Sequence, residues 1–163
     1  MVPMKTRPGK PRRPAATYCR VTLRVRWDGT VIPGVRRVSA LARATEVVEF
    51  RDGGDPNLTR RLPGRTGFEP IVLERLLTKD AAFEAWALLV SPGPVGPAAP
   101  ALQAFRKEVR LEICDKNGRV VLAYDVHRCW PIRYATFTGL ESGSSSCLVE
   151  SLTLEHDGWT RIP

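Results

Sequence analysis

The chain has 163 residues, 14 prolines and a formal net charge of +8. This length is enough for one domain with a hydrophobic core. No apolar run approaches the roughly 18–20 residues that a membrane span requires, so we expect no membrane insertion. The N-terminus is basic and lacks the apolar segment of a secretory signal, so we expect synthesis in the cytoplasm.

The positive charge is concentrated at the N-terminus. Basic residues without any acidic neighbour occupy the first fourteen positions: Lys5, Arg7, Lys10, Arg12 and Arg13. Together with the prolines between them, they predict a flexible, basic extension over residues 1–17, followed by one domain over residues 18–163. Two hypotheses remain for the extension: a segment that orders only on assembly, or an arm that binds nucleic acid.

The domain opens with a predicted β-hairpin. Residues 18–27 alternate apolar and polar, which is typical of a half-buried strand. The core face of this strand is predicted to hold Val21, Leu23 and Val25. An Asp-Gly pair at 28–29 favours a tight turn. Residues 30–38 return as a strand that Pro33-Gly34 interrupts, as at a sheet edge or a β-bulge.

The next stretch predicts two strands, residues 45–51 and 68–77, on either side of a polar loop, residues 52–67. We expect the second strand to place Ile71, Leu73 and Leu77 on its core face. Both outer faces are half apolar, which indicates a surface that is covered only after assembly. Because unstructured connections longer than a dozen residues are uncommon in compact domains, we interpret the loop as an arm that contacts a partner.

A single helix is predicted over residues 80–90. Phe83, Trp86 and Val90 recur at helical spacing, so one face packs onto the core. Thr78 or Asp80 can cap the N-terminus. A Pro/Gly-rich loop, residues 91–100, follows.

The remainder is predicted to be β-structure. A strand around residue 111 and a strand over 119–129 flank Asn117-Gly118, a pair that favours a type I′ hairpin. The Pro of Trp130-Pro131 is expected to break the second ladder before residues 132–138 resume it. A last strand covers 147–156. The predicted core residues of this half are Leu111, Leu122, Leu152 and Leu154.

No residue set predicts catalysis, cofactor binding or a metal site. Cys19, Cys114, Cys129 and Cys147 have no zinc-site spacing and are interpreted as reduced core thiols. His127 shares strand parity with Asp125 and Cys129, but strand alternation produces such spacing often. His156 beside Asp157 is interpreted as a surface pair. We therefore expect a protein that is not an enzyme.

The order of several motifs is more informative than any one of them. They are WDGTVIPGV at 27–35, TEVVEFRDGG at 45–54, RRLPGRTGF at 60–68, IVLERLLTKD at 71–80, DxNG at 115–118, CWPIRY at 129–134 and VESLTLEHDGW at 149–159. In this order the chain resembles the inner tail-tube proteins of contractile phages and of phage-tail-like contractile injection systems, a family related to the tube subunit of type VI secretion.

This resemblance implies a mainly β fold of two packed antiparallel sheets, a barrel-like sandwich with one side helix. It implies rings of six copies, stacked into a hollow tube that is driven through a target envelope when a sheath contracts. The implied partners are further copies of the chain, sheath subunits, baseplate or spike proteins, tube-terminating proteins and protein effectors in the lumen. The implied location is a phage-tail-like particle made in the bacterial cytoplasm and either kept there or released.

The resemblance also implies roles for residues. Candidates for contacts between subunits or rings are Arg51, Asp52, Asp55, Arg60, Arg61 and Arg65. Candidates for a lumen-forming hairpin are Val47, Glu49, Arg51, Val72 and Glu74, and Glu150, Leu152 and His156 match the family's closing strand. The alternatives are a tube initiator or terminal tube protein at the baseplate end and, in a different class, a basic nucleic-acid-binding module.

Overall fold

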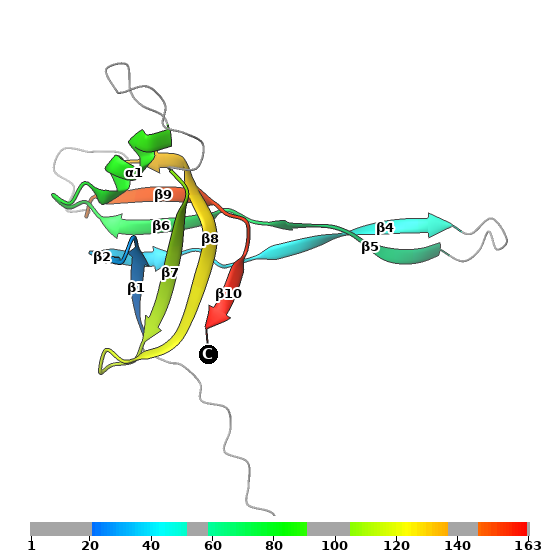
Figure 1. Ribbon diagram of the computed structural model, residues 1–163, viewed down its shortest axis with the longest axis horizontal. Helices are drawn as coiled ribbons and strands as arrows, with labels where there is room; N and C mark the ends of the chain where they lie inside the picture. The colour runs from blue at the N-terminus through cyan, green and yellow to red at the C-terminus, as the bar shows by residue number, and fades with distance from the viewer. Residues whose placement is uncertain (1–20, 52–58, 91–104, 137–146, 163) are drawn as a thin grey trace, which may run out of the picture.

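The computed structural model describes residues 21–51, 59–90, 105–136 and 147–162. Within them, ten strands and one helix form a body from which a long hairpin projects (Figure 1). The expected extension 1–17 and the expected loop 91–100 lie outside the described residues. In the described part of the chain, no helix has the length and apolar character needed to cross a membrane.

The first two strands form the predicted hairpin. β1 (Thr22–Trp27) pairs with β2 (Thr30–Ile32) through a turn in which Asp28 and Gly29 have φ angles of 51° and 74°. Positive φ at both positions gives the turn a twist that matches the strands. The assignment of Val21 to the core is wrong, since this residue precedes the paired part of the strand and is 45% exposed.

Pro33-Gly34 carries the chain from one layer to the other. Gly34 has a φ of 79°, and β3 (Val35–Val38) no longer accompanies β1 but pairs with β6 (Ile71–Leu76). β2 and β3 are the two ends of the strand path, so the predicted sheet edge is present at this interruption.

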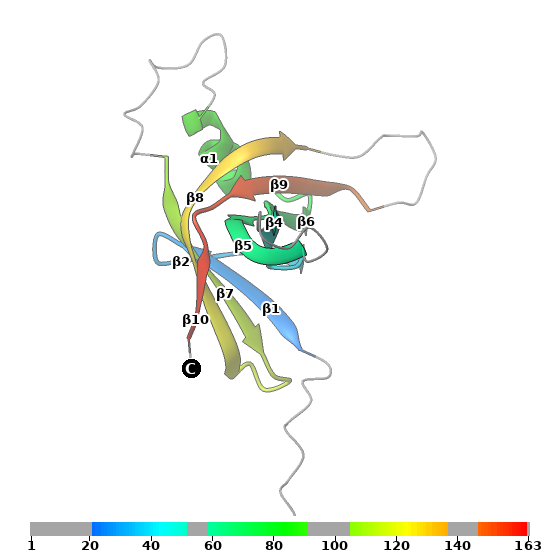
Figure 2. The same ribbon diagram turned by 90° about the vertical axis from the view of Figure 1, so that its right-hand side faces the viewer.

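Seven strands follow one antiparallel path, β2-β1-β7-β8-β9-β6-β3, and an eighth, β10 (Trp159–Ile162), lies off this path beside β8. β8 (Val120–Ala135) pairs with β7 (Lys107–Cys114) in its first half and with β9 (Val149–Glu155) in its second half. Its bend divides the path into two packed layers with α1 at the side (Figures 1 and 2). The predicted mainly β fold is therefore confirmed, although β2 and β3 are not hydrogen-bonded to each other and the body alone does not close into a barrel.

The expected break at Trp130-Pro131 is wrong. β8 runs through both residues, and the register shifts between Pro131 and Arg133. A β-bulge accommodates a proline, which has no N–H to give to the ladder. The strand therefore continues past the proline with a shifted register rather than ending.

The turn between β7 and β8 is a hairpin, but it is not type I′. Of Asn117 and Gly118, only the glycine has a positive φ, 76°. The Asp115 carboxylate accepts the N–H groups of Asn117 and Arg119 at 2.8 and 2.9 Å. An aspartate that bonds to its following backbone favours a turn that needs a single left-handed residue.

The core lies between the two layers and beneath α1 (Ala82–Val90). The first layer contributes Val25, Trp27, Val109, Leu111 and Val126, and the second contributes Ile71, Leu73, Leu152 and Leu154. From the helix, Phe83 and Trp86 insert against Trp27, whose ring lies 4.8 Å from that of Trp86. Leu23 is half-buried against this cluster, and Leu122 is only half-buried because it lies near the turn at the end of the β7–β8 hairpin.

Candidate assembly surfaces

The expectation of a loop over residues 52–67 is wrong, because residues 59–67 belong to a strand. β4 (Arg43–Arg51) pairs with β5 (Thr59–Phe68), and β6 begins only at Ile71. Leu62-Pro63-Gly64 looks like a turn in sequence, but the proline lies at the edge of a two-stranded sheet, where a missing N–H costs little. We call this two-stranded sheet the arm.

The arm continues the strand pairing of the body. β3 pairs with β6, the Ser39 N–H then donates to the Val72 carbonyl at 2.9 Å, and the Glu69 N–H donates to the Ala42 carbonyl at 3.0 Å. Residues 35–51 and 59–76 thus form one long hairpin whose root belongs to the second layer and whose distal half leaves the body (Figure 1).

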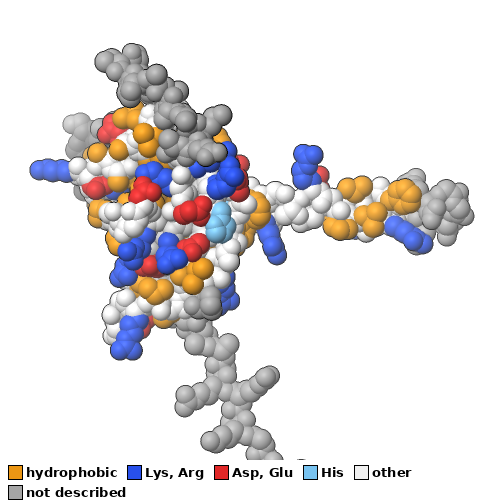
Figure 3. Space-filling view, viewed as in Figure 1, with side chains coloured by type: hydrophobic (Ala, Val, Ile, Leu, Met, Phe, Trp, Pro, Cys, Tyr) orange, Lys and Arg blue, Asp and Glu red, His pale blue; other side chains and the backbone are white. Residues whose placement is uncertain are grey.

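The arm exposes apolar side chains on both faces. Cross-strand partners share a face, so Val48, Phe50 and Leu62 lie together with Arg60 on one side. Val47 lies on the other side and is 63% exposed, while Phe50 is 53% exposed. Figure 3 shows, on the face turned to the viewer, apolar side chains along the distal half of the arm with basic side chains near them. An isolated two-stranded ribbon is marginally stable in water, so this surface is suited to being covered.

The root of the arm is fixed by an aromatic cluster. Phe68 packs against His156 and Trp159, with ring centroids 5.7 and 5.3 Å away. The His156 Nε2 lies 3.1 Å from the Glu69 carbonyl, and its Nδ1 accepts the Gly158 N–H at 3.1 Å. The interpretation of His156 as a surface residue is therefore wrong: it is 6% exposed and holds the start of β6 against the end of β9.

A buried ion pair lies under the helix. Arg75 and Glu150 are both fully enclosed, and the Arg75 Nε donates to the Glu150 carboxylate. The guanidinium also donates to the Asp80 carboxylate at 2.7 Å and covers the Phe83 ring at 4.3 Å. Arg75 was not predicted, and Leu77 was expected on the core face but is exposed because β6 ends one residue earlier.

The ion pair changes the titration of its neighbours. The hydrogen bond from Arg75, followed by that from the Ala82 N–H, lowers the pKa of Asp80. Burial, followed by the hydrogen bond to Glu150, raises the pKa of Tyr134 to about 12. Asp80 also caps α1, since it accepts the Ala82 N–H at 3.0 Å. The cluster therefore ties β6, β8, β9 and α1 together.

An apolar groove of about 500 Å³ lies between α1 and the second half of β8. Its apolar lining is Ala87, Leu88, Val90, Trp130, Pro131 and Ile132, with Glu84, Arg133 and Tyr134 beside them. Leu88 is 49% exposed and Ile132 is 46% exposed. Beyond Trp130, β8 pairs with β9 on one side and has no strand partner on the other side within the described residues, so the groove follows an open sheet edge.

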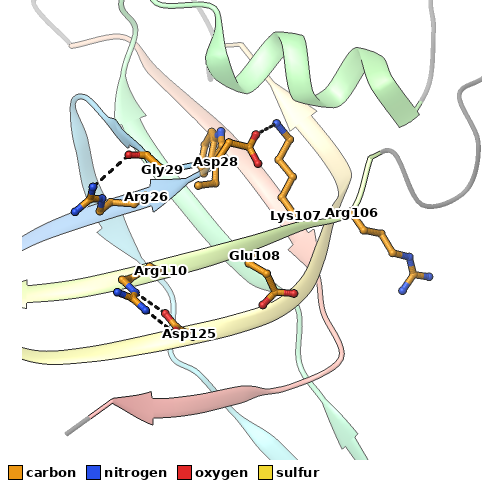
Figure 4. A pocket seen from close by; sticks show the side chains of 9 residues that line it. Arg26, Asp28, Gly29, Arg106, Lys107, Glu108, Arg110 and Asp125 are labelled. Carbon is orange, nitrogen blue, oxygen red and sulfur yellow. Dashed lines mark hydrogen bonds and ion pairs between the residues drawn. The ribbon is translucent and has the colours of Figure 1, made fainter.

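A second groove, of about 660 Å³, is lined by charged residues of β1, β7 and β8 (Figure 4). Its charges are satisfied within the chain. Lys107 pairs with Asp28, and Arg110 donates two hydrogen bonds, at 2.6 and 2.8 Å, to Asp125. The hydrogen bond from Arg110 lowers the pKa of Asp125. This groove is therefore lined by surface ion pairs, and its lining residues include no nucleophile.

The residues around His127 do not form a catalytic set. His127 lies between Glu108 and Thr160, at 2.8 Å from each, and Asp125 is engaged by Arg110. Cys129 is fully buried, and this burial raises its pKa to about 12, so its thiol stays protonated. Within the described residues, no group of three His, Cys, Asp or Glu side chains is placed to hold a metal ion.

The cysteines divide into two kinds. Cys114 and Cys129 are free and buried, as expected for core thiols. Cys147 is exposed because it lies ahead of β9, which corrects its assignment to the core. Cys19 lies outside the described residues.

The structure separates the predicted contact residues. Arg60, Arg61 and Arg65 lie on β5, exposed along the arm, with Arg61 paired to Glu49 at 3.3 Å. Asp52, Asp55 and the side chain of Arg51 lie outside the described residues. Val47 and Glu49 belong to the arm, whereas Val72 and Glu74 belong to β6 and face away from the core.

The body has open sheet edges, and the arm exposes apolar side chains. Surfaces of this kind are typical of a subunit whose neighbours cover them in an assembly. Residues 20–160 match the family described as T4-like virus tail tube protein gp19, and the chain belongs to this family. A comparison with curated proteins found no match.

Solved structures show the same fold. The chain is similar to one from the sheath–tube complex of PVC, an extracellular contractile injection system, in its extended state (TM-score 0.72, 18% identity, 93% of each chain). It is similar to one from the anti-feeding prophage baseplate (TM-score 0.69, 17% identity, 92% of this chain and 97% of the other). It is also similar to Hcp1 from Flavobacterium johnsoniae (TM-score 0.56, 13% identity, 86% and 94%).

Proposed function

We propose that the chain is a structural inner-tube subunit of a contractile injection system. Six copies form a ring, and stacked rings form the hollow tube that a contracting sheath drives through a target envelope. The observation that carries this proposal is the arm, a paired ribbon with apolar side chains on both faces that needs neighbouring copies to cover it. The tail-tube family of the chain supports it.

The open edges of the second layer support ring formation. β3 lies at one end of this layer and residues 131–135 of β8 lie at the other. These are different surfaces, so an edge-to-edge contact between copies is head-to-tail, and head-to-tail contacts close into rings or continue into filaments. In such a ring, Val72 and Glu74 on the outer face of β6 are candidates for the lumen wall.

The partners follow from this role. They are further copies of the chain, sheath subunits, baseplate or spike proteins and tube-terminating proteins, with protein effectors as candidate cargo in the lumen. The chain acts without catalysis, in a phage-tail-like particle assembled in a bacterial cytoplasm and kept there or released. The structural likeness to chains from baseplate, sheath–tube and tube-cap assemblies supports this set of partners.

The alternative role is a tube initiator or a terminal tube protein, since similar chains occur in the cap of the anti-feeding prophage and in the sheath/tube terminator of PVC. Quantitative mass spectrometry of purified particles distinguishes the roles. Tens of copies per particle support the main tube, and a single ring's worth of copies supports an initiator or terminator.

Sedimentation velocity tests the role of the arm in assembly. The wild-type chain is expected to form rings and larger species with increasing concentration, and the Arg60→Glu/Arg61→Glu variant is expected to remain a smaller species with an unchanged circular dichroism spectrum. Within one arm, Arg61→Glu replaces an exposed ion pair with two opposed carboxylates at positions 49 and 61, an effect of about 1 kcal/mol. A wild-type chain that stays monomeric at all concentrations would count against the proposed function.

A further inference from the structure

We propose that His156 is a pH-sensitive switch at the root of the arm. The neutral ring ties the start of β6 to the turn between β9 and β10, and a ring that gains a proton releases this tie. The inference concerns a buried titratable group that the proposed function does not use, and it does not depend on that function.

The hydrogen bonds of His156 fit only the neutral ring. The Glu69 carbonyl can only accept, so the Nε2 atom, 3.1 Å away, carries a hydrogen. The Gly158 N–H can only donate, so the Nδ1 atom, also 3.1 Å away, carries none. A proton added to Nδ1 would face this N–H and leave a buried donor without its acceptor, which is costly.

The other histidine of the chain has the opposite arrangement. The His127 Nδ1 lies 2.8 Å from the Glu108 carboxylate, and its Nε2 lies 2.8 Å from the Thr160 hydroxyl. A carboxylate accepts from the neutral and from the charged ring, and a hydroxyl can accept as well as donate. His127 therefore keeps both contacts when it is charged, which makes it a control within the same chain.

The charged groups around His156 do not replace the lost hydrogen bond. On the segments that surround the ring, the titratable and charged residues are Glu69, Glu155, Asp157, His127, Arg128 and Arg106. Glu69 offers its carbonyl, while its side chain is exposed. Asp157 is exposed and pairs with Arg128 at 3.0 Å. Strand alternation places Glu155 on the face opposite to His156.

Gly158 connects the switch to the arm. A Cβ at this glycine would meet the Phe68 Cζ at 3.0 Å, so its backbone lies directly against the Phe68 ring. Phe68 ends β5 and pairs with the first residue of β4, and the next N–H, that of Glu69, donates to the Ala42 carbonyl at 3.0 Å. A shift of Gly158 is therefore expected to reach both strands of the arm. The turn itself stays attached to β8 through the backbone of His127.

Hydrogen exchange of the full-length chain in dilute solution tests the switch. It is followed by mass spectrometry from pH 8 to the pH at which the NMR signals of the His156 ring show full charge. As this ring gains its proton, protection factors, corrected for the intrinsic pH dependence of exchange, are expected to fall several-fold around Phe68, Glu69 and Gly158. Those of the β7–β8 hairpin are expected to stay constant. At pH 8 the NMR signals of His156 are expected to show the Nε2–H tautomer.

Two matched variants assign the change to one histidine. His127→Gln is expected to keep the fall in protection, and His156→Gln, which cannot gain a proton, is expected to remove it. If His156→Gln does not fold, the two ring titrations of the wild type decide, since the fall must follow the signal of His156 and not that of His127. An Nδ1–H tautomer at pH 8, unchanged protection as His156 becomes charged, a fall that follows His127, or an equal fall throughout the chain would overturn the switch.

Discussion

At the residue scale, the buried Arg75–Glu150 pair has the largest expected effect on stability. Removing one charge leaves the other uncompensated in the core, which typically costs about 3–5 kcal/mol. Arg75→Ala is therefore expected to lower the free energy of unfolding by about this amount, as measured by urea denaturation. The double variant Arg75→Met/Glu150→Leu is expected to recover much of the loss, because it leaves no unpaired charge in the core; Asp80, which also loses its pairing with Arg75, is partly exposed. Equal losses in the single and double variants would contradict this account.

Asp80 is expected to contribute to acid sensitivity. Its pKa is lowered in the folded chain by the hydrogen bond from Arg75, so the carboxylate stabilises the fold above its unfolded pKa, near 3.8. This contribution is lost as the pH falls through the lower, folded pKa. Denaturant titrations from pH 6 to pH 2 are expected to show a steeper decline in stability for the wild type than for Asp80→Asn. Parallel curves would show that Asp80 does not contribute.

Some of these residues could have been found in the sequence. Arg75 shares strand parity with Ile71 and Leu73, and Glu150 shares it with Leu152 and Leu154, so opposite charges on two core faces signal a buried pair. His156 continues the parity of Leu152 and Leu154 one residue beyond the end of β9, so alternation was compatible with its burial but did not identify its partners. Its burial depends on Phe68 and Trp159, which approach it only after the strands are arranged in space.

At the scale of elements, Gly64 is the most sensitive point of the arm. It lies at the bulge of the ribbon, where a Cβ would meet the Val48 Cγ2 at 2.8 Å and the Glu46 carbonyl at 3.2 Å. Gly64→Ala is expected to distort the arm and to reduce assembly several-fold. The thermal midpoint of the isolated chain is expected to change little, because the arm lies outside the core.

Gly67→Ala is the matched control for Gly64→Ala. Gly67 lies on the same strand, and a Cβ there meets no heavy atom within 4 Å. Sedimentation velocity and negative-stain microscopy of the two variants therefore compare equal chemical changes at two sites of one strand. If both variants assemble as well as the wild type, the shape of the arm is not important for assembly.

Most elements of the body follow from local patterns, whereas β10 and the arm strand β5 were not predicted. Alternation and turn residues predict β1, β2, α1, β7 and β9 within a few residues. The sequence did not predict β5 for two reasons. Leu62-Pro63-Gly64 has the composition of a turn, and the apolar residues of this strand do not alternate as they would on a core face. A strand stabilised by its partner, and exposed on both faces, lacks the pattern from which strands are predicted.

At the scale of the whole molecule, the two layers and their side helix follow the resemblance to tail-tube proteins, and the family match over residues 20–160 agrees with it. The bend of β8, which divides the sheet into layers, was not predicted. The strand changes its partner from β7 to β9 between Cys129 and Trp130, next to Arg128, whose φ of 53° has no signal in the sequence. The long hairpin combines the β3–β6 pair of the body with the arm, so under the proposed function it would connect the fold of one copy to its neighbours.

The most direct test of the central claim is cryo-electron microscopy of the purified chain at high concentration. The account predicts hollow rings that stack into tubes, with each arm buried against a neighbouring copy. Isolated monomers at every concentration, or assemblies in which the arms remain free in solvent, would contradict it.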